Sequence, residues 1–389
     1  MNELITGYAG AAVFDGTALL DAHVLLVQGG VITGIVAEAD VPAGVDVQWL
    51  DGGVLTPGFV DLQVNGGGGV MFNDDPSVAT LRVMAAAHAR LGATTILPTL
   101  ITDRPEITRA AIDAVERAVV DGAGVDGGIA GLHLEGPHLA VSRKGAHEGG
   151  LIRPMEAQDL EILCDAAQTL PVLKVTCAPE SVTLEQMRVL ARAGVILSLG
   201  HTDASYDQCV AAAGAGVVCV THLFNAMSQL GSREPGVVGA ALSDGRLSAG
   251  LIGDLVHVHG PTIRLALAAK QGPGRVFLVS DAMAVAGTDR QSFTLNGRKV
   301  TRRDGRLTLD DGTLAGADVD LATALGNLRA LGIEQVQALA MVTTYPGEVL
   351  TPGGNTGKLC QGACADFVHL SDAMGLRTVW RSGMEVTQV

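Results

Sequence analysis

The sequence predicts an α/β protein whose main part is a closed (β/α)8 barrel of the TIM type, with a small β-sandwich domain built from both chain termini. Two observations indicate this fold. In the middle of the chain, short apolar runs alternate with helical stretches, and eight such repeats over roughly 290 residues are typical of a closed barrel. At both ends, strand-like runs are separated by glycine-rich turns. A doubly wound open sheet is the alternative, but the glycine run at residues 65–70 lacks GxGxxG spacing.

The apolar runs and the turn residues between them define the predicted elements. Barrel strands are expected at residues 59–64, 94–98, 129–134, 172–176, 195–199, 217–220, 247–252 and 276–279, with helices at 77–91, 105–120, 184–193, 204–213 and 261–269. A β-hairpin turning at Asn296-Gly297 is expected at 293–309, inserted after the eighth strand. The small domain takes strands at 11–14, 23–28, 31–36, 46–49, 365–369, 377–381 and 384–387. We therefore divide the chain into residues 1–55 and 348–389, which form the small domain, and 56–347, which form the barrel.

Composition limits the classes of protein to which this chain can belong. Aromatic residues make up only 3% of the chain and hydrophobic residues 48%, so the core is expected to consist mainly of Ala, Val, Leu and Ile. The formal net charge of −15 argues against nucleic acid and against anionic membrane surfaces as partners. No apolar run approaches the ~18 residues of a membrane span, and no basic residue precedes an apolar segment at the amino terminus. We expect a cytoplasmic protein with reduced cysteines.

The stretch from residue 195 to residue 227 carries the strongest chemical signal. The apolar runs at 195–199 and 217–220 are each followed, one residue later, by a histidine, His201 and His222. A helix-like segment between them, capped by Ser205 or Asp203, makes the two strands parallel neighbours. Both imidazoles then emerge at one rim of the sheet, and neutral imidazole is the commonest metal ligand in proteins. A capping or packing role for each histidine is the alternative.

In a barrel, polar residues at the carboxyl ends of the strands converge on the active site. Glu135 with His201 and His222 makes a three-ligand set of the zinc type, which leaves one position for water. A salt bridge from Glu135 to Arg143 or Lys144 is the alternative. The polar residues at the carboxyl ends of the predicted strands are Gln63, Glu135, His201, His222 and Asp281.

Two further residues near the strand ends have predicted roles. Asp281 closes the eighth apolar run and would serve as general base beside an activated water, whereas a structural Asp would cap the following turn. His133 lies two residues before Glu135, so it points to the same face of the strand. We expect His133 to pack behind the metal ligands.

Basic residues on three glycine-rich loops, His147, Arg233 and His257, could bind an anionic group of a substrate. Each one alone is more often a solvated surface residue. His259 competes with His257 for this role.

Taken together, these residues resemble those of the amidohydrolase superfamily and, within it, of the N-acetylglucosamine-6-phosphate deacetylases. The resemblance covers nearly the whole chain. The matching motifs are PGFVDLQVNG (57–66), LPTLIT (97–102), LHLEGP (132–137), KGAH (144–147), LGHTDA (199–204), THLFNAM (221–227), REPG (233–236) and LVSDA (278–282).

The resemblance implies a metal-dependent hydrolase that removes the acetyl group from N-acetyl-D-glucosamine 6-phosphate, giving glucosamine 6-phosphate and acetate in amino-sugar catabolism and cell-wall recycling. It implies that Glu135, His201 and His222 bind the metal, that Asp281 is the acid–base residue and that His147 polarises the acetyl carbonyl. Arg233 would reach the sugar phosphate from the neighbouring subunit of a homodimer. The implied substrate-binding set is Gln63, His147, Asn225, Ala226, Arg233 and His257.

The first strand departs from much of the superfamily. Many members carry His-x-His there to hold a second metal, and this chain has Asp61-Leu62-Gln63. The departure favours one tightly bound ion per chain, zinc first, with Fe, Co and Mn as alternatives. Three other functions stay open: an N-acetylgalactosamine-6-phosphate deacetylase, a D-aminoacylase and a non-catalytic barrel that serves as an interaction protein.

Overall fold

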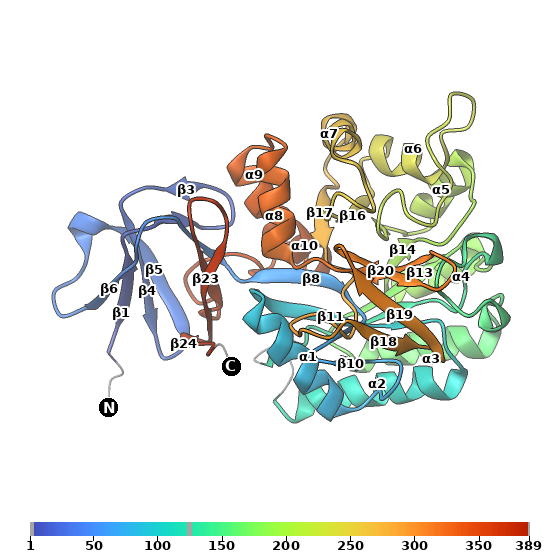
Figure 1. Cartoon of the computed structure of the whole chain (residues 1–389), viewed down its shortest axis with the longest axis horizontal. Coiled ribbons are helices and arrows are strands. Elements are labelled where there is room, and N and C mark those ends of the chain that lie inside the picture. The colour runs from blue at the N-terminus through green and yellow to red at the C-terminus, as the bar shows by residue number, and fades with distance from the viewer. Residues whose placement is uncertain (1–3, 123–126, 388–389) are drawn as a thin grey trace.

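The computed structural model describes residues 4–122 and 127–387. Its largest sheet has eight parallel strands in the order β17-β16-β15-β14-β13-β12-β11-β8 (Figure 1). Seven neighbouring pairs are parallel and follow the chain order, which confirms the predicted barrel. The strands are β8 (Phe59–Val64), β11 (Ala93–Ile101), β12 (Leu132–Glu135), β13 (Leu173–Cys177), β14 (Ile196–Leu199), β15 (Cys219–Val220), β16 (Ser248–Ile252) and β17 (Val276–Val279).

The seam between the first and the last barrel strand is closed by contacts just beyond the regular ladder. Val64 and Ala282 form a parallel bridge, and the backbone N–H of Asn65 donates to the carbonyl of Ala282 at 2.8 Å. The backbone N–H of Ser280 donates to both carboxylate oxygens of Asp61 at 3.2 Å. The alternative of an open sheet is therefore wrong.

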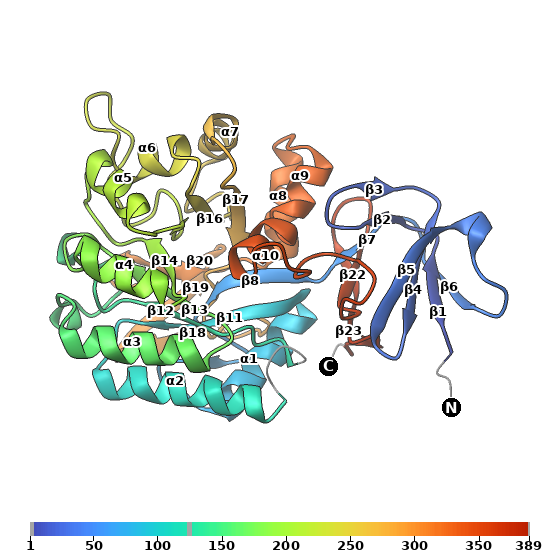
Figure 2. The same ribbon diagram turned by 180° about the vertical axis from the view of Figure 1, so that it is seen from behind.

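Helices cover the outside of the barrel (Figures 1 and 2). The Ser205 hydroxyl oxygen caps α5 by accepting from the backbone N–H of Gln208, and the side-chain oxygen of Gln208 accepts from the backbone N–H of Ser205. The helix therefore starts at Tyr206 rather than at residue 204. The helices are α1 (Val78–Arg90), α2 (Pro105–Val120), α3 (Ala157–Thr169), α4 (Leu184–Arg192), α5 (Tyr206–Gly214), α6 (Gly236–Ser243), α7 (Gly260–Ala269), α8 (Leu321–Ala330), α9 (Gln335–Ala340) and α10 (Thr344–Leu350).

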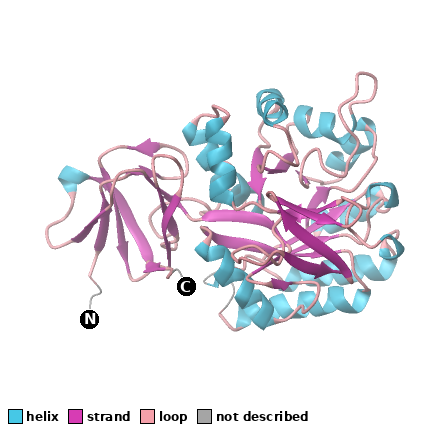
Figure 3. Cartoon of the chain, in the orientation of Figure 1, coloured by secondary structure: helices cyan, strands magenta, loops and turns pink. Residues whose placement is uncertain are grey.

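The small domain contains two sheets, at one end of the molecule (Figure 3). One has the order β5-β4-β1-β6 and the other β24-β23-β22-β7-β2-β3. β7 pairs with β2 from the amino end and with β22 from the carboxyl end, so both termini build this domain as predicted. The exact limits of the three parts stay a prediction. The strands are β1 (Thr6–Ala9), β2 (Ala12–Phe14), β3 (Leu19–Leu20), β4 (His23–Gln28), β5 (Val31–Ala37), β6 (Asp46–Trp49), β7 (Val54–Pro57), β22 (Phe367–Leu370), β23 (Leu376–Arg381) and β24 (Met384–Glu385).

The segment inserted after β17 is larger than the predicted hairpin. β18 (Ser292–Leu295), β19 (Arg298–Arg303), β20 (Arg306–Leu309) and β21 (Leu314–Ala317) form a four-stranded antiparallel sheet. The Asn296-Gly297 turn has φ values of 49° and 73°, as a type I′ hairpin requires. The sequence missed β21 because its LAGA segment has no β-branched residue. A further short antiparallel pair, β9 (Gly66–Gly67) and β10 (Val70–Met71), follows β8.

Among the described residues, no helix is both long and apolar enough to cross a membrane. None of the six cysteines, all of which lie in the described part of the chain, forms a disulfide bond.

Candidate active site

The carboxyl ends of the barrel strands bring five predicted residues to one place. Gln63 and Glu135 lie at the ends of β8 and β12, and the other three lie two residues beyond β14, β15 and β17. These three, His201, His222 and Asp281, have φ values of 49°, 30° and 49°, a left-handed conformation that is uncommon for residues other than glycine. Such backbone outliers often occur where the structure holds a functional side chain in position.

Glu135, His201 and His222 meet at a single point. The Oε1 atom of Glu135 lies 3.1 Å from His201 Nε2 and 2.9 Å from His222 Nε2, and the two nitrogens lie 3.1 Å apart. All three side chains are buried. Atoms that bind one tetrahedral zinc at about 2.0–2.1 Å lie roughly 3.3 Å from one another, so this spacing fits a shared ion. The alternative of an ion pair with Arg143 is wrong, because Arg143 pairs with Asp203 at 2.5 Å.

The hydrogen-bond chemistry of His201 also fits a cation. Its Nδ1 lies 2.8 Å from the carbonyl oxygen of Arg143, which can only accept, so Nδ1 carries the ring proton of the neutral imidazole. Nε2 then presents a lone pair to the carboxylate of Glu135. Two acceptors at 3.1 Å repel unless a proton or a cation lies between them. One divalent cation would satisfy all three atoms at once, with the outer nitrogen of His201 held by a backbone carbonyl.

Burial and the close contacts within this cluster shift the pKa values of Glu135 and His222. Burial disfavours ionisation of Glu135, but the adjoining rings of His201 and His222 hold its pKa well below the usual range. Burial likewise disfavours charging of His222, but the hydrogen bond with Glu135 holds the pKa of His222 above its usual value. His222 Nδ1 is buried and has no hydrogen-bond partner within the described part of the chain.

Asp281 is held beside this cluster by two amides. Asn65 Nδ2 donates to Asp281 Oδ1 at 2.8 Å, and Gln63 Nε2 donates to the same oxygen at 3.1 Å. The Gln63 amide also lies 3.2 Å from both carboxylate oxygens of Glu135. Burial, together with the negative charge of Glu135, raises the pKa of Asp281 to about 6. A carboxyl group tuned towards neutrality is suited to take up and release a proton.

His147 is oriented by a residue that the sequence did not single out. The backbone N–H of Thr102 donates to His147 Nδ1 at 3.3 Å, and the Thr102 hydroxyl lies 2.8 Å from the same nitrogen. Nδ1 therefore accepts, and Nε2 carries the proton. Burial, with a smaller contribution from His201, lowers the pKa of His147 to about 3, so the ring stays neutral. The position of Thr102, directly after the second strand in LPTLIT, was the signal available.

His147 is also a geometric candidate for a metal ligand. Ligand atoms of Glu135, His147 and His201 lie within 4.8 Å of one another. The tautomer set by Thr102 places a proton on His147 Nε2, which removes the lone pair that a metal would need. The set that includes His222 is also tighter, with spacings of 2.9–3.1 Å.

A cavity of about 390 Å³ opens above these residues. Asn225, Ala226 and His257 line it together with Asp281 and His147. His257 Nδ1 lies 2.6 Å from Asp254 Oδ2, which fixes the orientation of its ring. The exposed loop residue Arg233 is not among the residues that line this cavity.

Behind Glu135, the barrel interior contains a buried polar cluster. His133 Nδ1 lies 3.1 Å from Thr99 Oγ1, and its Nε2 lies 2.8 Å from Thr176 Oγ1. Lys174 Nζ lies 3.1 Å from the same Nε2 and is itself buried. His133 thus has the packing position that the sequence predicted. Lys174 was missed, because it lies within an apolar run and gives no spacing signal.

Comparison with known proteins agrees with this geometry. Residues 54–386 match the amidohydrolase family. The chain belongs to that family. It is 39% identical to an N-acetylgalactosamine-6-phosphate deacetylase of Shewanella sp. (strain ANA-3), over 96% of this chain and 94% of the relative.

Two solved structures are similar over nearly the full length. The N-acetylglucosamine-6-phosphate deacetylase of Pasteurella multocida has a TM-score of 0.92 and 33% identity, covering 98% of this chain and 99% of the other. A variant of the Mycobacterium smegmatis N-acetyl-D-glucosamine-6-phosphate deacetylase, in complex with N-acetyl-D-glucosamine-6-phosphate, has a TM-score of 0.90 and 31% identity, with both chains covered completely.

Proposed function

We propose that this amidohydrolase removes the acetyl group from N-acetyl-D-glucosamine 6-phosphate, giving glucosamine 6-phosphate and acetate. The observation that carries this proposal is the meeting of Glu135, His201 and His222 within 3.1 Å, at the floor of a cavity that Asp281 and His147 also line. The substrate is inferred from the similar solved structures, which carry this activity in their names. Amino-sugar catabolism and cell-wall recycling in the cytoplasm are the process and place that we infer.

Glu135, His201 and His222 would hold one divalent cation, zinc first, with Fe, Co and Mn as alternatives that accept the same ligands. When bound, the cation supplies Lewis-acid activation of water and of the amide carbonyl. Gln63 would keep the set at one ion, since its amide donates to Glu135 and Asp281 and offers no imidazole for a second.

The chain's own residues would move the protons. Asp281 would take a proton from the attacking water and later deliver it to the nitrogen of the departing amine. His147, with its proton on Nε2, would donate a hydrogen bond to the acetyl oxygen as negative charge develops there. One such donor contributes roughly 3 kcal/mol to transition-state stabilisation.

The sugar and its phosphate would lie against the loops above the strands. Asn225 and Ala226, mostly through backbone groups, and His257 would contact them, since all three line the cavity. Arg233 would complete the phosphate site in a homodimer.

The sugar epimer is the main competing substrate, because one relative at 39% identity is named for the galactose form. We expect acetate release from N-acetylglucosamine 6-phosphate to exceed release from N-acetylgalactosamine 6-phosphate, from unphosphorylated N-acetylglucosamine and from N-acetyl-D-amino acids. Measurement of kcat/KM for the four substrates separates the alternatives. A higher value for the galactose epimer would change the substrate and leave the chemistry unaltered, whereas no acetate release from any of them would contradict the proposal.

The pH dependence should report on Asp281. Its carboxyl, with a pKa of about 6, must be ionised to accept a proton, so kcat/KM should fall about tenfold per pH unit below that value. A bound cation would favour the carboxylate and shift this acid limb to lower pH. A profile of kcat/KM from pH 4.5 to 9 tests this, with metal content checked at each end. Activity that increased as the pH fell from 7 to 5 would contradict the role of Asp281 as base.

Arg233 allows a test of whether the two subunits of a homodimer share a phosphate site, with Arg233 supplied by the neighbouring chain. Arg233→Ala should raise KM for the phosphorylated sugar, because loss of a charge-assisted contact costs roughly 1.5–3 kcal/mol. It should leave kinetics with the unphosphorylated sugar nearly unchanged. Its position outside the cavity lining supports a contribution from a partner subunit.

Mixing the Arg233→Ala and Asp281→Asn variants tests whether Arg233 acts in the site of the partner subunit or in the site of its own chain. In a mixed dimer, one site would combine an intact Asp281 with an intact Arg233 of the other chain. Random exchange makes about half of the dimers mixed, so about a quarter of all sites should recover. No recovery after verified subunit exchange would reject the shared site.

A further inference from the structure

The inserted sheet, β18 to β21, forms one wall of the catalytic cavity. Leu295 is buried in an apolar cluster with Met283, and both side chains line the cavity. The inserted sheet therefore reaches the place where the substrate would lie, although it follows the last barrel strand in sequence. The lining residues that it and the turn before β21 supply are Leu295, Thr313, Leu314 and Gly316.

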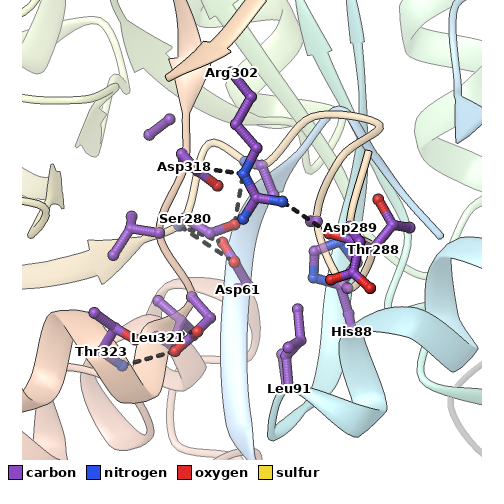
Figure 4. Close-up of a pocket in the computed structure, with 17 residues that line it drawn as sticks. Asp61, His88, Leu91, Ser280, Thr288, Asp289, Arg302, Asp318, Leu321 and Thr323 are labelled. Carbon is purple, nitrogen blue, oxygen red and sulfur yellow. Dashed lines mark hydrogen bonds and ion pairs between the residues drawn. The ribbon is translucent and has the colours of Figure 1, made fainter. Parts of the chain in front are cut away.

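One end of β19 is fixed to the rest of the barrel domain by Arg302. Arg302 Nε donates to Asp318 Oδ2 at 2.8 Å, and Arg302 Nη1 donates to the carbonyl oxygen of Thr288 at 2.8 Å (Figure 4). β19 also pairs on both sides, with β18 and with β20. A strand that is paired on both edges and anchored at one end is a rigid support for side chains at its other end.

At the other end of β19, Arg298 reaches the loop that carries His147. Arg298 and Arg302 are four residues apart with the buried Val300 between them, so all three side chains lie on one face of the strand. Arg298 Nη2 donates to the carbonyl oxygen of Ala146.

This carbonyl belongs to the peptide unit that joins Ala146 to His147. The N–H of the same unit donates to the carbonyl oxygen of Lys144 at 3.0 Å. A peptide unit is planar, so hydrogen bonds at both of its ends fix its orientation and the position of the His147 backbone. Thr102 holds the ring of His147 at Nδ1. His147 is therefore held at its ring from the second barrel strand and at its backbone from the inserted sheet.

Arg298 occupies this position at a cost in free energy. Its Nε is buried and has no hydrogen-bond partner within the described part of the chain. No carboxylate of residues 4–122 and 127–387 forms an ion pair with it, whereas Arg303 on the same strand pairs with Asp304 and has a side chain that is 84% exposed. A buried donor without a partner destabilises a fold and calls for a functional explanation.

We propose that Arg298 is the positioning residue for His147. Through the carbonyl of Ala146, it holds the loop so that the Nε2 proton of His147 meets the acetyl oxygen. The proposal rests on the role of His147 in the proposed function. Without Arg298 the loop still carries His147, but the hydrogen-bond donor is no longer held in one place as charge develops on the acetyl oxygen.

Arg298→Met keeps the length of the side chain and removes its charge and its donors. We expect kcat to fall about 10- to 100-fold, because misplacing a reacting group by about 1 Å can cost about 10²-fold in rate. KM should change by less than about threefold, because Arg298 is not among the residues that line the cavity. Arg303→Met on the same strand is the matched control and should keep the kcat of the parent. Unchanged kcat in Arg298→Met, or a loss that appears only in KM, would overturn the proposal.

A double-mutant cycle with His147→Ala separates positioning of His147 from a general effect on the structure. In the His147→Ala background, Arg298→Met should lower kcat by less than about twofold, because the group that it positions is already absent. A loss as large as in the parent background would show that Arg298 acts in another way and would overturn the proposal.

Amide hydrogen exchange tests the same contact without any substrate. In Arg298→Met, the peptide segment that contains His147 should exchange at least about fivefold faster than in the parent or in Arg303→Met, because its peptide unit loses one of two anchors. Unchanged exchange would overturn the proposal. If the parent releases acetate from none of the four substrates, the proposed function fails, and the exchange measurement still decides whether Arg298 holds the loop.

If Arg298→Met does not fold, Arg298→Lys replaces it, because an ammonium group keeps the charge but not the planar guanidinium. We then expect kcat to fall about three- to tenfold and exchange of the segment to become about twofold faster. Unchanged kcat or unchanged exchange in the folded Arg298→Lys variant would overturn the proposal.

Discussion

Asp281→Asn is expected to lower kcat by about 10²- to 10⁴-fold while the fold and the bound cation are retained, since a positioned acid–base group contributes about that much. The asparagine can keep both anchoring contacts, because Asn65 and Gln63 each donate to Oδ1. Its amide nitrogen, however, cannot take a proton from water. The loss should therefore appear in kcat rather than in KM or in stability.

The matched control is Asp165→Asn, an exposed position on α3 that should leave kcat unchanged. Thermal denaturation and metal analysis of both variants separate lost chemistry from lost structure. Near-normal turnover by Asp281→Asn would reject Asp281 as the acid–base residue.

Glu135→Gln is expected to lower the rate of acetate release by a similar factor, because the variant should lose its bound cation. The parent should contain about one tightly bound divalent ion per chain, and the variant well below one, because a neutral amide replaces the carboxylate that touches both His201 and His222. The uncompensated imidazoles would then repel each other at 3.1 Å. Acetate release should fall in proportion to metal content.

Stability offers an independent measurement. A ligand present at about 1,000 times its Kd stabilises a protein by roughly 4 kcal/mol, so chelation of the parent should lower its Tm and chelation of the variant should not. Glu161→Gln on α3 is the exposed control and should retain the metal. Two tightly bound ions per chain in the parent would contradict the interpretation of Gln63, and full occupancy in Glu135→Gln would contradict the ligand set.

Most of the barrel elements could be predicted from local features of the sequence. All eight barrel strands and the five named barrel helices appear, with boundary differences of a few residues. Apolar runs of strand length depend on burial alone, so a single sequence reveals them. The four-stranded insertion was predicted only in part, because β21 is a weak strand former by itself. β7 was not predicted, and it finds its partners only in β2 and in β22 from the other end of the chain.

The sequence by itself determined the barrel and the convergence of Glu135, His201, His222 and Asp281, because residue type and position at a strand end are local properties. Only the tertiary structure decided how these groups are held. Thr102 fixes the tautomer of His147, Asn65 and Gln63 anchor Asp281, and the carbonyl of Arg143 orients His201. All of these hydrogen bonds join residues more than 40 positions apart, and each depends on ångström-scale geometry that a pattern of residue types does not encode.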